Sequence, residues 1–88
     1  MQKPESFGDY VKLMREQRGM SGRDLAKRVD VVNTTIIKVE NGQMPKIDLF
    51  VRLVDALELD VISAVNFLPP YRQLYEQILK SQKGANRG

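Results

Sequence analysis

The order of apolar and polar side chains along the chain predicts an all-α fold. Between residues 6 and 68, apolar side chains recur at three- and four-residue intervals, as Phe7, Tyr10, Val11 and Met14 do, and this spacing lines one face of a helix. No stretch keeps the strict apolar-polar alternation of a half-buried β-strand. Glycine, proline and capping residues divide the region into five helical segments.

Capping residues mark where several of these segments begin and end. Ser6 with Asp9 and Ser21 with Asp24 have the spacing of a capping box, in which a serine and an acid three residues later bind free N–H groups at a helix start. Asn41-Gly42 has the composition of a helix C-terminus. Local hydrogen-bonding side chains therefore support the boundaries that the apolar pattern indicates.

Two of the segments, residues 21–29 and 33–41, are short and lie three residues apart. Helices of this length need other helices as a platform, so Ile36 and Val39 are expected to point inward. The outward positions of the second segment are Asn33, Thr34, Ile37, Lys38 and Asn41. An exposed helix of this diameter fits the major groove of B-DNA, where side chains can read base edges.

Residues spread over the whole region carry a resemblance to a known family. They are Leu13-Met14-Arg15, Arg18-Gly19-Met20-Ser21, Leu25-Ala26, Ile36, Glu40-Asn41-Gly42, Leu53 and Leu57-Glu58-Leu59. In this order and spacing they resemble the Cro/C1-type (XRE family) helix-turn-helix regulators. The resemblance implies a five-helix, lambda-repressor-like DNA-binding domain over residues 6–68, with the helix-turn-helix at 21–41.

The resemblance also implies which side chains contact DNA. Base edges would be read by Val32, Asn33, Thr34, Ile37 and Lys38. Asn can pair with adenine, Lys can donate to guanine, and an apolar side chain can touch a thymine methyl. The DNA backbone would be contacted by Ser21, Arg23, Thr35, Asn41, Gln43 and Lys46. A buried ion pair between Arg15 and Glu40 would hold the recognition helix on the domain.

Several positions depart from the family pattern. Gly22 stands where the family favours Gln, whose side chain anchors to phosphate. Asp30 stands where a left-handed Gly is usual, a conformation that Asp tolerates better than most residues. Val32 stands at the N-cap of the recognition helix and cannot cap it. We therefore expect the cap to shift to Asn33 or Thr34.

The C-terminal segment predicts one further, short amphipathic helix over residues 69–80. Its apolar stripe is Tyr71, Leu74, Tyr75, Ile78 and Leu79. The stripe can pack back on its own domain or form a two-fold dimer, and we favour the dimer, because it would present two recognition helices to half-sites one DNA turn apart. Residues 1–5 are expected to form a flexible arm and residues 81–88 a disordered tail.

Composition narrows the classes of function. The chain of 88 residues suits one domain, and its zero Cys and zero His remove disulfides, thiol catalysis and the commonest metal ligand and general base. We expect no cofactor, no metal and no enzyme activity. No apolar run approaches the ~18 residues of a membrane span. The net charge of +3 comes wholly from residues 71–88, where Lys80, Lys83 and Arg87 are expected to add non-specific DNA affinity.

These observations lead to two hypotheses about function. The first is a sequence-specific DNA-binding regulator, a repressor that binds an inverted repeat of double-stranded DNA as a homodimer. The resemblance implies that it acts in the cytoplasm, on the nucleoid, in a prokaryotic, phage or plasmid setting. The alternative is a protein-interaction module, such as an antitoxin or a regulator controlled by a partner protein. Gly22 and the apolar pairs Val31-Val32 and Ile36-Ile37 favour this alternative.

Overall fold

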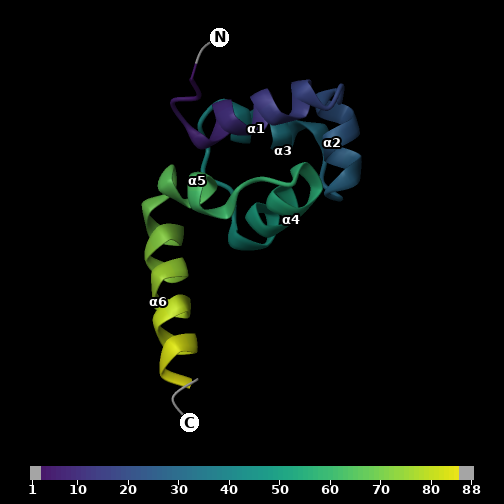
Figure 1. Cartoon of the computed structure of the whole chain (residues 1–88). Coiled ribbons are helices and arrows are strands. Elements are labelled where there is room, and N and C mark those ends of the chain that lie inside the picture. The colour runs from purple at the N-terminus through teal and green to yellow at the C-terminus, as the bar shows by residue number, and fades with distance from the viewer. Residues whose placement is uncertain (1–2, 86–88) are drawn as a thin grey trace.

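The computed structural model describes residues 3–85 and contains six α-helices in that range (Figure 1). They are α1 (Phe7–Gln17), α2 (Gly22–Arg28), α3 (Asn33–Glu40), α4 (Ile47–Leu57), α5 (Val61–Asn66) and α6 (Pro69–Ala85). The described residues contain no β-strand, and the predicted all-α fold is confirmed. Helices α1 to α5 form a rounded body, and α6 extends away from it (Figure 1).

Both serines that the sequence singled out cap helices. Ser21 accepts from Asp24 N at 3.0 Å and Asp24 Oδ2 accepts from Ser21 N at 3.0 Å, so the capping box of α2 is complete. The hydrogen bond from the Ser21 backbone N–H, and after it the interaction with the Ser21 side chain, lower the pKa of the Asp24 carboxyl. Ser6 accepts from Asp9 N at 3.1 Å, but the Asp9 carboxylate accepts from Glu5 N at 3.2 Å instead of closing the box.

The core is built from one apolar face of each helix in the body. Its largest fully buried side chains include Val11 of α1, Leu25 of α2, Ile36 of α3, and Leu53 and Leu57 of α4. Burial of an aliphatic side chain of this size stabilises a fold by roughly 1.5–3 kcal/mol. The two short helices α2 and α3 therefore depend on α1 and α4 for their stability, and the outer face of α3 stays free.

Gly8 permits a close contact between α1 and the end of α3. A Cβ atom at this position would overlap Val39 O and would lie 2.7 Å from Glu40 O, both in the last turn of α3. These neighbours are backbone atoms, which cannot move aside by changing rotamer. The lack of a side chain at Gly8 consequently allows the C-terminal end of α3 to lie close to the first turn of α1.

Helix α6 is longer than the sequence suggested. Pro69 and Pro70 open it, because proline is tolerated in the first helical turn, where N–H groups have no helical partner. The helix continues to Ala85, so residues 81–85, expected to belong to a disordered tail, are helical. Lys, Gln and Ala in this stretch are good helix formers. Residues 86–88 lie outside the described range, as do residues 1–2 of the expected N-terminal arm.

The first turns of α6 pack on the body of the same chain. The Tyr71 ring lies 5.1 Å from that of Phe50, and its hydroxyl donates to Pro45 O at 2.6 Å. Burial, with a smaller contribution from Asp48, raises the pKa of the Tyr71 phenol. Tyr75 also packs against the core. Two of the five residues expected at a dimer interface thus have contacts within their own domain.

Candidate nucleic-acid interface

A short turn joins α2 to α3 and sets the direction of α3. Asp30 adopts φ of 60°, the left-handed conformation that the sequence predicted for this position. Val31 N donates to Ala26 O at 2.9 Å and closes the end of α2. Arg52 of α4 donates from Nη1 to Val29 O at 3.2 Å. The turn is therefore tied to α4 as well as to α2, a contact that sequence periodicity gave no sign of.

Helix α3 buries one face and exposes the other. Ile36 and Val39 are buried, as the helical spacing predicted. Four of the five residues expected to read bases are exposed: Val32, Thr34, Ile37 and Lys38. Val32 directly precedes α3, and the other three lie within the helix. Asn33, the fifth, is half-buried. The outward face thus combines an amide, a hydroxyl, an ammonium group and two apolar side chains.

The start of α3 differs from the expectation in one respect. Val32 is the N-cap and makes no side-chain capping bond, but the cap does not shift to Asn33 or Thr34, which occupy the first two helical positions. The burial of Ile36 and Val39 fixes the rotation of the helix, and a backbone bond from Thr35 N to Val32 O at 3.0 Å closes its first turn. Packing decides the boundary here, not side-chain capping.

Gly22, the first residue of α2, lies beside Asn33, the first residue of α3. A Cβ atom at position 22 would lie 3.2 Å from Asn33 Oδ1, closer than nearly all ordinary contacts of this kind. The absence of a side chain at Gly22 leaves the Asn33 amide room in its present position. The departure from the family pattern at Gly22 is therefore coupled in space to one of the residues expected to read DNA.

The ion pair expected between Arg15 and Glu40 is present and has two parallel hydrogen bonds. Arg15 Nε donates to Glu40 Oε2 at 2.8 Å, and Nη2 donates to Oε1 at 3.0 Å. Arg15 Nη1 also donates to Met20 O at 2.9 Å. The side chains are only 12% and 13% exposed, and the bond to Glu40 raises the pKa of Arg15. Arg15 thus joins α1 to the residue before the N-cap of α2 and, through Glu40, to the end of α3.

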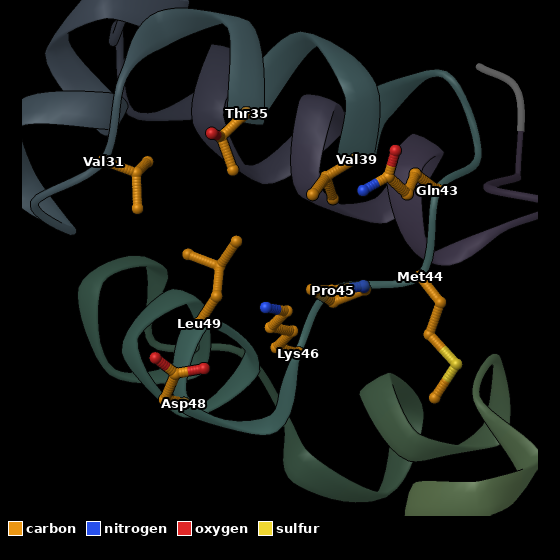
Figure 2. Close-up of a pocket in the computed structure, with 9 residues that line it drawn as sticks. All are labelled: Val31, Thr35, Val39, Gln43, Met44, Pro45, Lys46, Asp48 and Leu49. Atoms are coloured by element: carbon orange, nitrogen blue, oxygen red, sulfur yellow. The ribbon is translucent and has the colours of Figure 1, made fainter.

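A hollow of about 290 Å³ opens between α3 and the start of α4 (Figure 2). Thr35, Gln43 and Lys46, three of the six residues expected to contact the DNA backbone, line it. Figure 2 shows Thr35 on the α3 side and Lys46 and Asp48 on the α4 side. The remaining three, Ser21, Arg23 and Asn41, are exposed at the ends of α2 and α3.

Charge is distributed unevenly over this surface. Exposed basic side chains on α2 and α3 are Arg23, Lys27, Arg28 and Lys38. The only acid in α3 is Glu40, which is paired with Arg15, so the outward face of α3 carries no acid. Two exposed acids, Asp24 and Asp30, alternate with these basic residues in the sequence and offset part of their charge. Of the basic residues expected to add affinity from the C-terminal end, Lys80 is exposed on α6, whereas the Lys83 side chain and Arg87 lie outside the described residues.

The structure also contains an apolar groove that the sequence analysis missed. It has a volume of about 180 Å³ and is lined by Ile47, Phe50, Val51, Val61, Val65, Tyr71, Leu74, Tyr75 and Ile78, from α4, α5 and α6. Ile47 and Val61 are apolar residues at the starts of α4 and α5, and both are exposed. Each is the first residue of its helix. At a helix start, a residue on the apolar face can lie beyond the edge of the core and stay exposed.

Among the described residues, no group of acidic side chains is arranged to hold a metal ion. No helix within residues 3–85 has the length and apolar character that a membrane crossing requires.

In comparison with known proteins, a family model described as "Helix-turn-helix" matches residues 11–62, more than half of the chain. A comparison of the chain with curated proteins found no match. The matched range runs from within α1 into α5 and includes α2, α3 and the turn between them.

Proposed function

The chain belongs to the helix-turn-helix family of Cro/C1 type (XRE), and on this premise we propose that it is a sequence-specific transcriptional regulator that reads DNA with α3. Membership gives DNA binding and a role in transcription. The observation that carries the proposal is the outward face of α3, which is exposed and free of acidic side chains. The Arg15–Glu40 pair fixes the C-terminal end of this helix to α1. A helix presented in this way can enter the major groove.

In this proposal the residues around α3 divide into two sets. Val32, Asn33, Thr34, Ile37 and Lys38 contact base edges. Ser21, Arg23, Thr35, Asn41, Gln43 and Lys46 contact phosphates on either side. Contacts to phosphates fix the position of the protein on the duplex, and contacts to bases select the sequence. The grouping of Thr35, Gln43 and Lys46 around one hollow supports a common phosphate contact beside α3.

We further propose that the protein binds DNA as a homodimer and represses transcription from an inverted repeat. Leu74, Ile78 and Leu79 are exposed on α6, and the groove between α4, α5 and α6 offers an apolar surface for the same residues of a second copy. To bind both half-sites, a two-fold pair must present two copies of α3 about 34–36 Å apart, one DNA turn. A dimer bound across a promoter represses by occupying it. Such a regulator acts on the nucleoid in the cytoplasm of a prokaryotic host, the replicon being a chromosome, a phage or a plasmid.

The test is equilibrium binding to the DNA that flanks its own gene, compared with random DNA, at several salt concentrations. A sequence-specific regulator binds its site typically 10³–10⁷ times more tightly than other DNA. Affinity for both DNAs should fall with salt, while the preference for the specific site persists. A ratio near one, also for sequences selected from a random library, would refute the proposal.

A second candidate function is a protein-interaction module, such as an antitoxin or a regulator controlled by a partner protein. The apolar groove, whose lining includes the exposed Val51 and Ile47, favours this candidate, because contiguous apolar surface often marks a protein-binding site. The same binding experiment separates the two. A protein without DNA preference whose groove variants lose a partner would be an interaction module.

A further inference from the structure

Two apolar side chains, at the start and in the middle of α3, are exposed to solvent. Val32 is 68% exposed and Ile37 is 48% exposed. They do not contribute to the core, because the buried residues of α3 are Ile36 and Val39 on its inward face. Single exposed aliphatic residues are common on protein surfaces, but these two lie on the surface that the proposed function assigns to DNA.

Helical geometry places Ile37 in the middle of that surface. Residues four apart lie above one another on a helix, so Ile37 lies between Asn33 and Asn41, with Lys38 beside it. Val32 precedes the first turn of the same helix. If α3 enters the major groove, the Ile37 side chain faces the base edges and cannot turn back into the protein.

The major groove offers few surfaces that suit an aliphatic side chain. Base edges present hydrogen-bond donors and acceptors there, and the apolar feature among them is the C5-methyl group of thymine. An aliphatic side chain placed against a donor or acceptor would remove its water without replacing the hydrogen bond, which is unfavourable. Placed against a methyl group, it removes apolar surface from water on both sides, which is favourable.

We propose that Val32 and Ile37 recognise pyrimidine 5-methyl groups, so that each half-site carries a 5-methylated pyrimidine opposite each of these side chains. This inference rests on the proposed function of α3 and adds the chemical class of base that it selects. Thymine and 5-methylcytosine share the 5-methyl group, and the experiment distinguishes them. A protein partner for the same residues is less well supported, because Asn33, Thr34 and Lys38 alternate with them and would need polar partners throughout.

The experiment begins with the full chain and sequences that it selects from a random double-stranded library. In the best site, each thymine is replaced in turn by uracil, which removes only the methyl group. We expect roughly fourfold weaker binding at each of the two positions, the effect of one lost buried methyl, and no change at other thymines. Cytosine at these positions should bind more weakly than 5-methylcytosine, whose methyl group restores part of the contact.

Protein variants connect the effect to the two residues. Ile37→Ala should lose the preference for thymine over uracil at one position and Val32→Ala at the other, with circular dichroism to verify folding. Ile62→Ala, an equally exposed aliphatic residue on α5, is the matched control and should keep both preferences. A specific site that tolerates uracil everywhere, or a uracil penalty that survives in both variants, would overturn the inference while leaving the proposed function intact. Failure to select any sequence would instead overturn the proposed function, and this inference with it.

Discussion

Substitution of Gly8 by alanine tests whether the close contact between α1 and α3 sets the position of the reading helix. Two effects of opposite sign are expected. Alanine favours a helix over glycine by about 0.8–1.0 kcal/mol. The new Cβ atom, however, would overlap Val39 O and lie 2.7 Å from Glu40 O, and overpacking of this kind typically costs about 1–3 kcal/mol.

The overlap should exceed the gain in helix propensity, because both neighbours are backbone atoms and relief requires α1 and α3 to separate. We therefore expect Gly8→Ala to lower the free energy of unfolding by up to about 2 kcal/mol. DNA binding should weaken further than the unfolded fraction explains, since the end of α3 moves relative to the body. Urea unfolding and equilibrium DNA binding at a temperature where the variant is folded measure the two effects.

The control for helix propensity is a pair of variants at Lys12, an exposed position in α1. The difference in stability between Lys12→Gly and Lys12→Ala measures the glycine penalty in the same helix without a steric contact. If Gly8→Ala stabilises the protein by the amount that this pair gives, the contact with α3 does not constrain the helix, and the reasoning is wrong.

Three other predictions concern the ion pair, the reading face and α6. Glu40→Ala should lower the free energy of unfolding by about 3 kcal/mol, because it leaves a mostly buried charge unpaired; a loss under about 1 kcal/mol in urea unfolding would mean that the pair behaves as a surface ion pair. Lys38→Ala should cost about 1–3 kcal/mol of binding and relax the preference at one base, whereas Arg23→Ala should weaken binding to all sequences alike and reduce the salt slope by about one; unchanged affinity and preference in Lys38→Ala would contradict the assigned reading face. Leu74→Asp combined with Ile78→Asp should sediment as a monomer, and a dimer that survives both changes would lie on another surface.

Local features of the fold were predictable from the sequence. Ser21 and Asp24 are three residues apart, and their reciprocal hydrogen bonds need no distant partner. The inward direction of Ile36 and Val39 follows from the helical period alone. The pairing of Arg15 with Glu40 spans 25 residues, and only the resemblance to a known family could indicate it.

Features that depend on distant segments were not predictable in this way. Gly8 gives no local signal, because its role arises from two carbonyl groups more than 30 residues away. The full length of α6 was missed because its polar end has no apolar pattern to follow, although the Gln, Lys and Ala in it favour a helix. The groove between α4, α5 and α6 combines residues from three helices, and exposure at helix starts such as Ile47 cannot be read from periodicity.

In addition to the burial of Ile36 and Val39, contacts at both ends of α3 hold it in position, and this has a consequence for recognition. At the C-terminal end, Gly8 and the Arg15–Glu40 pair set its distance from α1. At the N-terminal end, Arg52 anchors the preceding turn through Val29 O. A helix held in this way loses little conformational freedom on binding. Differences in affinity between DNA sequences should therefore come from the side chains on the outward face, and substitutions there should change base preference without changing stability.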